Sequence, residues 1–343
     1  MKLCRSMVKS RFLLFLILTT REIASSQTTT TNILGDGKRE GHATNTHSCD
    51  TIRNEVPKDL TFITKYGFYH KYTEAYGIPI VSSERVSDRA LKRACHITRF
   101  LFADRYDVRD AFYKYTGRFA VVGINEKTTD LPEHSNLPSW YNIGYARGLG
   151  ATLVRPFSSG GEENILCLKK DRYYKDDIFF HEAAHGVAEV GLAGGVTNLY
   201  ERLKRLYIAA KRAGKWNNTY SITNHREYFA EGMQSYFNNH REGPNPPNGV
   251  HGPVNTNSEL KEYDTGLYNL IKELFPCENT YHWCSENAAG SNLKMNCPVT
   301  KQPDPIGYVK ATSRPICYKA TGRSPGIFKI PMSGKIIAIK LEH

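Results

Sequence analysis

The chain has 343 residues, which suits one sizeable domain with appendages or two domains. Hydrophobic residues make up 40% of it and charged residues 23%, proportions that are ordinary for a globular protein. The formal net charge is +12, but the chain has no basic block with interleaved aromatic residues and no nucleic-acid-binding motif, so we expect no nucleic-acid partner.

The N-terminus has the features of a secretory signal peptide. Basic residues precede the apolar run 12–18, which is too short to span a bilayer, and small residues precede a cleavage site near Ser26. The alternative is a membrane anchor, but no later stretch approaches the roughly 18 apolar residues of a spanning helix. We therefore expect residues 1–26 to be removed from a secreted, extracellular protein without stable membrane insertion.

Cysteine usage agrees with secretion. Of the eight cysteines, Cys4 would leave with the signal peptide, so seven remain. An oxidising compartment favours disulfides, and an odd count leaves one thiol without an intramolecular partner. Spacing does not reveal the connectivity. For Cys49 we expect a disulfide to the next segment, for instance to Cys95, and the alternative is a cysteine that caps the zinc until processing. Cys167 lies in an apolar run and is predicted to be the buried free thiol.

Residues 27–55 are polar and predict a disordered linker or a pro-segment, and the chain reads as globular over 56–276. Apolar spacing and turn residues then define the expected elements. In chain order these are a helix at 86–103, a strand at 119–124, a loop at 130–141, a second strand at 150–155, a turn at 158–161, and helices at 176–190, 196–212, 225–238 and 258–274. Gly191, Gly194 and Gly195 are expected to end the helix at 176–190.

Residues 277–343 have a different character. They carry four of the seven remaining cysteines, many turn residues and short apolar stretches, and the chain ends within a strand-like run. They predict a small disulfide-bearing β module, either whole or truncated. The expected fold class is therefore α+β, with a helix-rich domain around a small sheet followed by this module.

The segment His181-Glu182-Ala183-Ala184-His185 lies inside the helix predicted at 176–190. Residues four positions apart share one helix face, so both imidazoles can reach one tetrahedral metal ion. Glu182 then faces a water on the metal, from which a carboxylate can take a proton. Two solvated histidines on an ordinary helix are the alternative, but the apolar neighbours predict a buried helix. We predict a zinc site with Glu182 as the general base.

A third protein ligand is needed, and the helix at 225–238 offers two carboxylates four positions apart, Glu227 and Glu231. We assign Glu227 to zinc and Glu231 to the N–H of a ligand imidazole, whose tautomer it would fix. The exchange of these two roles remains the alternative. Glu189 is too far along the first helix to share the metal and is expected to be solvated.

Around these residues the chain resembles the catalytic domain of anthrax lethal factor and its lethal-factor-like relatives, which are gluzincins. The resemblance lies in the His181–His185 motif and in Asn224–Gly232, extends to 148–153, 161–164 and 262–268, and covers about residues 60–275. It implies a zincin-like fold and a zinc metallopeptidase. It also implies that Tyr220, seven residues before Glu227, stabilises the oxyanion, where the alternative is a surface aromatic. The delivery domains of the toxin have no counterpart in this chain.

These features predict a secreted zinc-dependent metalloendopeptidase. A protein or peptide substrate would pair with an exposed strand edge, for which residues 151–155 are the candidate. The alternative is a secreted, non-catalytic binding protein on a lethal-factor-like scaffold, in which the C-terminal module contacts glycan or matrix. A purely structural zinc site would need a fourth protein ligand, for which no candidate is evident.

Overall fold

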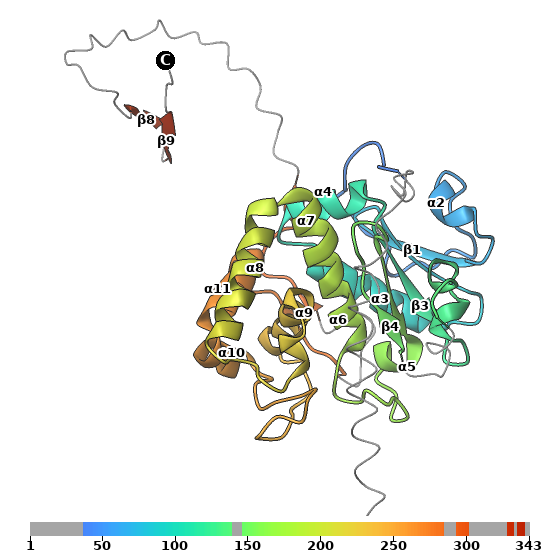
Figure 1. Cartoon of the computed structure of the whole chain (residues 1–343). Helices are drawn as coiled ribbons and strands as arrows, with labels where there is room; N and C mark the ends of the chain where they lie inside the picture. The colour runs from blue at the N-terminus through green and yellow to red at the C-terminus, as the bar shows by residue number, and fades with distance from the viewer. Residues whose placement is uncertain (1–36, 139–145, 285–292, 302–327, 333–334, 340–343) are drawn as a thin grey trace, which may run out of the picture. The chain divides into compact units, whose positions relative to one another are not determined.

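The computed structural model describes residues 37–138, 146–284 and 293–301, together with the backbone of 328–332 and 335–339. The chain divides into two units between Gln302 and Pro303. The first unit combines a mixed sheet with a larger set of helices (Figure 1), so the predicted α+β class is confirmed.

Five strands of the described residues form the main sheet, in the spatial order β1-β2-β3-β5-β4. The antiparallel pair β1 (Lys71–Ala75) and β2 (Ile78–Ser82) begins it. The parallel strands β3 (Arg118–Val122) and β5 (Phe157–Gly161) continue it. The short β4 (Gly148–Leu149) runs antiparallel to β5 and is the end strand on that side of the sheet.

Two helices connect the parallel strands β2 and β3, as a parallel pair requires. They are α3 (Asp88–Leu101) and α4 (Tyr106–Lys114), and α3 confirms the helix predicted at 86–103. The Ser87 side chain caps α3 by accepting a hydrogen bond from the Ala90 amide at 3.3 Å.

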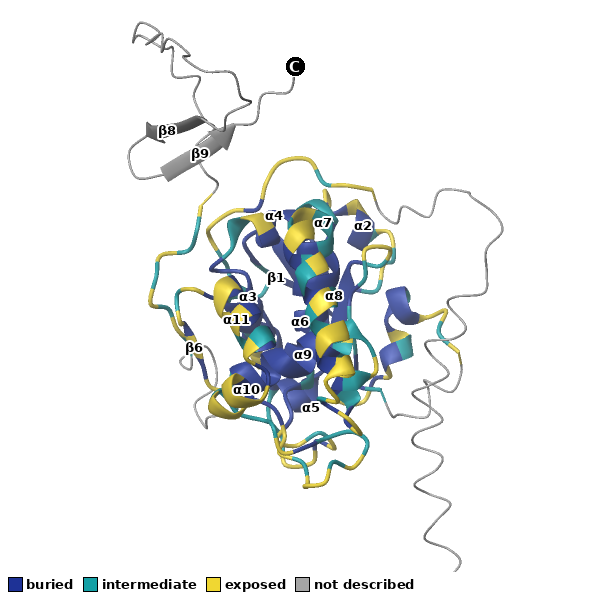
Figure 2. Cartoon of the chain, turned by 60° about the vertical axis from the view of Figure 1, so that its left-hand side comes forward, coloured by how far each residue is buried: buried dark blue, intermediate teal, exposed yellow. Residues whose placement is uncertain are grey.

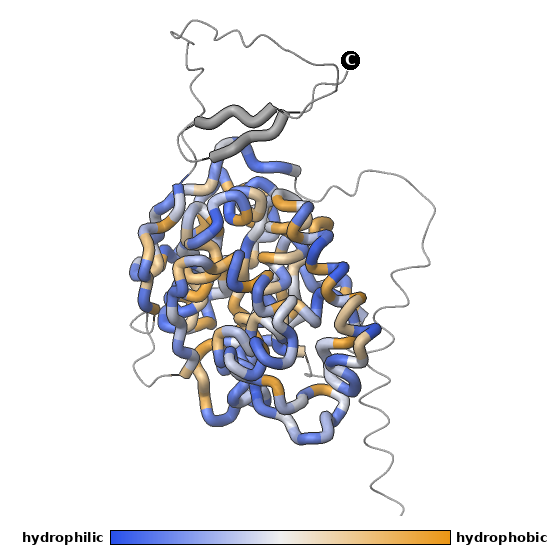
Figure 3. The backbone as a smooth tube through the Cα atoms, turned by 90° about the vertical axis from the view of Figure 1, so that its left-hand side faces the viewer, coloured by the Kyte–Doolittle hydropathy of each residue, from blue (hydrophilic) through white to orange (hydrophobic). Residues whose placement is uncertain are grey.

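Side chains alternate between the two faces of the sheet along each strand. Each face is buried against a hydrophobic core of its own. On β3, Phe119 and Val121 belong to the larger core, which the helices share. Ala120 and Val122 belong to a smaller core that also includes side chains of the short helix α2 (Thr61–Thr64). The hydrophobic segments accordingly gather inside the first unit, while hydrophilic segments dominate its outside (Figure 3).

The helical half of the first unit follows β5 and the short helix α5 (Glu162–Ile165). Its elements are α6 (Ile178–His185), the π-helical turn η6 (Gly186–Leu192), α7 (Ala193–Gly195), α8 (Thr197–Arg212), α9 (His225–Tyr236), α10 (Asn257–Tyr263) and α11 (Thr265–Leu274). Figure 2 shows α9 buried between its neighbours, whereas α8, α10 and α11 each expose one side. The single helix expected at 258–274 is interrupted at Asp264, whose side chain caps α11.

Of the three glycines that were expected to end the helix of the His181–His185 motif, only Gly195 does so, and Gly191 and Gly194 lie within the helical path. The helical path runs through η6 and α7 as far as Gly195. A Cβ on Gly191 would lie 2.5 Å from Cγ1 of Val108 on α4, and a Cβ on Gly186 would lie 2.9 Å from Phe112 of the same helix. These glycines therefore permit close helix packing and do not terminate the helix.

The second predicted strand is displaced along the chain. Residues 150–155 form no strand, and β5 lies at 157–161, where we expected a turn. A Cβ on Gly160 would lie 2.6 Å from Cδ2 of Phe179, so the small residues of β5 are needed where α6 crosses the strand. Composition alone predicted a turn because serine and glycine are common in both settings.

Three disulfides join cysteines of the described residues: Cys49–Cys95, Cys167–Cys284 and Cys277–Cys297. Cys49 thus forms a disulfide with the next segment as expected, and its partner is Cys95, which the sequence had offered as an example. The prediction that Cys167 is a free thiol is wrong, because Cys284, 117 residues later, folds back onto it. An apolar run indicates burial, but it does not reveal a distant partner. Cys317 lies outside the described residues.

The first unit also includes sequence on both sides of the predicted domain. Residues 37–55 do not form a disordered linker: Cys49 is fully buried, and His47 and Arg53 form bridges to β1. At the other end, β6 (Thr280–Tyr281) and β7 (Leu293–Lys294) lie beyond the expected boundary at 277 but still within the first unit.

The second unit contains one described hairpin, in which β8 (Phe328–Met332) pairs antiparallel with β9 (Lys335–Ile339). Both strands fall on the apolar stretches of the predicted β module. The expected signal peptide and residues 27–36 lie outside the described residues. Among the described helices, none combines the length and apolar character that crossing a lipid bilayer requires.

Candidate metal centre

Helix α6 crosses strand β5 and carries His181 and His185 on one face of the helix. Its first turn is capped by Asp177, whose carboxylate accepts a hydrogen bond from the Phe180 amide at 3.0 Å. Phe179 and Phe180 are fully buried and anchor the helix in the larger core. The two imidazoles are therefore fixed by packing on a rigid element.

Helix α9 brings Glu227 to the same place. Asn224 caps this helix by accepting hydrogen bonds from the amides of Arg226 at 2.8 Å and Glu227 at 3.1 Å. Glu227 therefore stands in the first turn, where a carboxylate suits the helix dipole. Tyr228 and Phe229, which follow it, are fully buried and fix the helix.

Three ligand-type atoms converge at this point. Glu227 Oε2 lies 3.1 Å from Nε2 of His181 and 3.2 Å from Nε2 of His185. Donor atoms around a tetrahedral zinc ion at 2.0–2.1 Å are about 3.3 Å apart, so two nitrogens and one oxygen at this spacing fit such an ion. His181, Glu182 and His185 also offer ligand atoms within 4.8 Å of one another. The described residues thus include a candidate metal-binding group.

The electrostatics of the group are those of tightly paired charges. Burial would lower the pKa of His181, but the hydrogen bond with Glu227 and the nearby carboxylates raise it to about 10. Burial would likewise raise the pKa of Glu227, but His185 and His181 hold it well below its usual range. Glu227 is therefore a carboxylate at neutral pH, the form that binds a cation.

Glu182 lies beside this group and against the end strand of the sheet. A Cβ on Gly148 of β4 would lie 2.8 Å from Cγ of Glu182, and a Cβ on Gly150 would lie 2.6 Å from Cβ of His185. Burial raises the pKa of Glu182, an effect that His181 and His185 oppose. A raised pKa brings a carboxylate closer to the range in which it can both take and return a proton.

Tyr220 also reaches this group. Its ring stacks on that of His181, with centroids 6.3 Å apart and planes at 22°. Burial, followed by the charges of Glu227 and Glu182, raises the pKa of Tyr220 well above its ordinary value. The phenol therefore stays protonated and can donate a hydrogen bond at neutral pH.

Gln234, which the sequence analysis did not identify, contacts the candidate metal ligands. Its Oε1 lies 2.8 Å from Nδ1 of His181, whereas the Glu231 carboxylate lies 3.4 Å from the same nitrogen. An amide oxygen can only accept, so it selects the tautomer that carries its proton on Nδ1 and leaves Nε2 free for a metal. The spacing of Gln234, seven residues after Glu227, was the available signal, since it repeats the same helix face.

Glu189 is not solvated as expected. It is 4% exposed, its carboxylate lies 3.0 Å from Nε of Arg226, and it accepts a hydrogen bond from the Tyr200 hydroxyl at 3.0 Å. These contacts join η6 to α8 and α9. Glu189 lies in the π-helical turn η6, and the two helices that cover it could not be inferred from its spacing after His185.

Comparisons with family models, curated proteins and solved structures found no match to this chain.

Proposed function

We propose that the chain is a secreted zinc metalloendopeptidase, a gluzincin that resembles the catalytic domain of anthrax lethal factor. One observation carries this proposal: Glu227 Oε2 lies 3.1 and 3.2 Å from Nε2 of His181 and His185. Glu182 and Tyr220 border the same point. Zincin-like identity, zinc and peptide hydrolysis are parts of this one proposal.

The roles follow from the chemistry of each side chain. His181, His185 and Glu227 would hold zinc, which when bound polarises the scissile carbonyl and lowers the pKa of water to about 7. Glu182 takes a proton from the attacking water and passes it to the leaving amine nitrogen. Tyr220 donates a hydrogen bond to the carbonyl oxygen as negative charge develops on it.

The substrate would lie along the end strand of the sheet. The candidate edge at 151–155 is not a strand, but β4 at 148–149 ends the sheet and touches Glu182 through Gly148. An extended peptide that pairs with β4 would have its backbone beside the general base. The substrate class is therefore an extended protein or peptide segment.

Secretion is part of the same proposal. Three disulfides among the described residues are typical of proteins from oxidising compartments. The signal-like composition of residues 1–26 agrees with that location.

The test is a peptide-library screen with and without a metal chelator, using the purified chain and two variants. The wild type should cleave peptides in a chelator-sensitive way. Glu182→Gln should keep its zinc and lose at least about 100-fold in turnover, since it removes the proton acceptor alone. Glu227→Ala should lose zinc. Undiminished cleavage by Glu182→Gln would show that another group is the base, and full zinc content in Glu227→Ala would reassign the ligand role to Glu231.

A further inference from the structure

A second group of metal-ligand side chains lies beside the first. Asp176, His240 and His251 each offer one ligand atom, and these atoms all lie within 4.8 Å of one another. Asp176 stands just before α6, His240 just after α9, and His251 in the segment that leads to α10. None of the three belongs to the proposed zinc ligands.

Hydrogen bonds from neighbouring side chains occupy one atom of His240 and one of Asp176, which leaves the other atom of each for a metal ion. His240 Nδ1 is engaged by the Ser235 hydroxyl at 3.2 Å, which leaves Nε2. Asp176 Oδ1 accepts a hydrogen bond from Nε2 of Gln234 at 2.7 Å, which leaves Oδ2, 3.8 Å from Nε2 of His251. Metal ligands in proteins are commonly oriented by such outer hydrogen bonds.

Two buried side chains face each other at this point. His240 Nε2 and Glu231 Oε2 form an ion pair with 3.0 Å between them, which places a second carboxylate oxygen next to the group. Both side chains are nearly inaccessible, since His240 is 6% exposed and Glu231 is 4% exposed. A cation bound to His240 Nε2 would therefore also lie next to Glu231 Oε2.

We propose that Asp176, His240 and His251 bind a second divalent transition-metal ion, such as zinc, with Glu231 Oε2 beside it. Two imidazoles and a carboxylate are a donor set that zinc and similar ions prefer over magnesium or calcium. The carboxylates of Asp176 and Glu231 together balance the charge of a dication.

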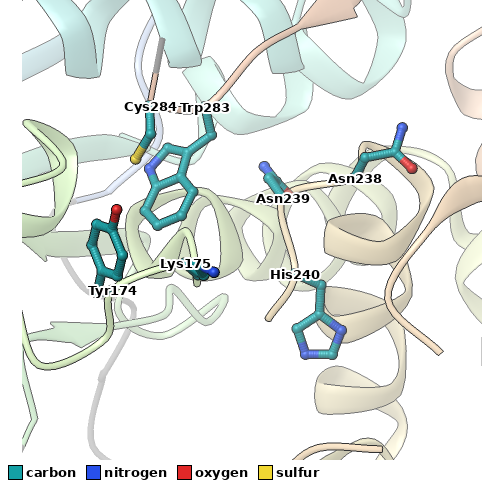
Figure 4. Close-up of a pocket in the computed structure, with 7 residues that line it drawn as sticks. All are labelled: Tyr174, Lys175, Asn238, Asn239, His240, Trp283 and Cys284. Atoms are coloured by element: carbon teal, nitrogen blue, oxygen red, sulfur yellow. The ribbon is translucent and has the colours of Figure 1, made fainter. Parts of the chain in front are cut away.

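A metal ion could reach the group formed by Asp176, His240 and His251 from solvent. The side chain of His251 is 16% exposed and connects the group to solvent. His240 in addition lines a pocket whose far side is formed by Trp283 and Cys284 (Figure 4). A buried ligand set with one accessible member and an adjoining pocket is what a removable metal requires.

The two sites share Gln234, which contacts His181 through Oε1 and Asp176 through Nε2. A metal on Asp176 would hold this amide in the orientation that the proposed zinc ligand uses. The inference goes beyond the proposed function, and it does not require that the first site be catalytic.

The test is zinc stoichiometry by elemental analysis, with circular dichroism as a check on folding. The wild type should bind two zinc ions per chain. His251→Ala and Asp176→Asn should each bind one, and that retained ion reports an intact fold. His70→Ala, which changes an exposed histidine far from both groups in sequence, is the matched control and should bind two.

A second measurement isolates the new site. The double variant His181→Ala/His185→Ala should bind one Co²⁺ and show visible d–d absorption, which His251→Ala in that background should abolish. The proposal is overturned if the double variant binds no metal, or if His251→Ala keeps the full wild-type stoichiometry. A wild type that binds a single ion lost only with His185→Ala would also overturn it while leaving the proposed function intact.

Discussion

At the level of single residues, Tyr220 allows the proposed reaction to be separated from metal binding. Its phenol borders Glu227 and His181 but is not needed to hold a cation. Tyr220→Phe should lower kcat by about 100- to 1,000-fold with little change in KM, as expected for loss of a donor used only in the transition state. Zinc content should stay at the wild-type value. Wild-type kcat in this variant would rule out the oxyanion role and leave a packing role for the ring.

His134 predicts a pH dependence of stability that is independent of the metal centre. The ring is 1% exposed, packs on Phe157, and lies 3.0 Å through Nε2 from the Ser159 hydroxyl. Burial, followed by the charge of Arg155, lowers the pKa of His134 to about 3 from its ordinary value of 6.5. The unfolded chain therefore binds one more proton than the folded chain between pH 6.5 and 3.

The free energy of unfolding should consequently fall as pH falls through this window, by about 1.4 kcal/mol per pH unit from His134 alone. Above pH 6.5 the residue contributes no pH dependence. Urea denaturation of the wild type and of His134→Gln at several pH values checks this, because the amide does not titrate. Parallel curves for the two proteins would contradict the assignment.

At this scale the sequence predicts which residues have a functional role better than it predicts which residues they contact. The spacing of His181 and His185 was sufficient to propose a shared ion, because helical geometry puts residues four apart on one face. The third ligand was assigned to Glu227 on a later helix, with Glu231 as the alternative. The role of Gln234 was missed because an amide carries no metal-binding signature of its own. The burial of Glu189 was missed because it depends on two helices that arrive from later in the chain.

At the level of elements, the glycines of η6 predict a packing requirement. A Cβ on Gly191 would lie 2.5 Å from Val108 Cγ1 on α4. Gly191→Ala should destabilise the protein by about 1–3 kcal/mol through overpacking. Gly191→Ala combined with Val108→Ala should recover part of this loss, because the added methyl group then replaces part of the removed side chain. Additive losses in the double variant, measured by urea denaturation, would show that this contact is not the cause.

Helices and strands were predicted correctly where their own side chains determine their position. They were misplaced where contacts with neighbouring elements determine it. The helices α3, α8 and α9 follow from the helical spacing of their apolar residues, although only α8 has a single buried face and α9 is buried on all sides. β5 did not, because Ser158, Ser159 and Gly160 become a strand only through pairing with β3 and contact with α6. Gly191 was likewise taken as part of a helix end because its close packing against α4 leaves no local signature, whereas Gly195 does end the helical path.

At the level of the whole molecule, the disulfides predict a dependence of stability on loop length. Cys167–Cys284 closes a span of 117 residues, and Cys277–Cys297 closes one of 20. In the chain-entropy model, removal of the longer bond should cost about 1.5 kcal/mol more than removal of the shorter one. Urea denaturation of Cys167→Ala/Cys284→Ala and of Cys277→Ala/Cys297→Ala provides the comparison. Equal losses would show that entropy of the unfolded chain does not dominate here.

The sequence by itself determined the α+β class, most helices and the candidate metal ligands. These features depend on periodicity, spacing and composition, which are local properties of the chain. Only the tertiary structure decided the partner of Cys167, the true end strand β4, the contacts of Gln234, and the grouping of Asp176 with His240 and His251. Each of these depends on segments far apart in sequence that packing brings together, and no local pattern records which segments will meet.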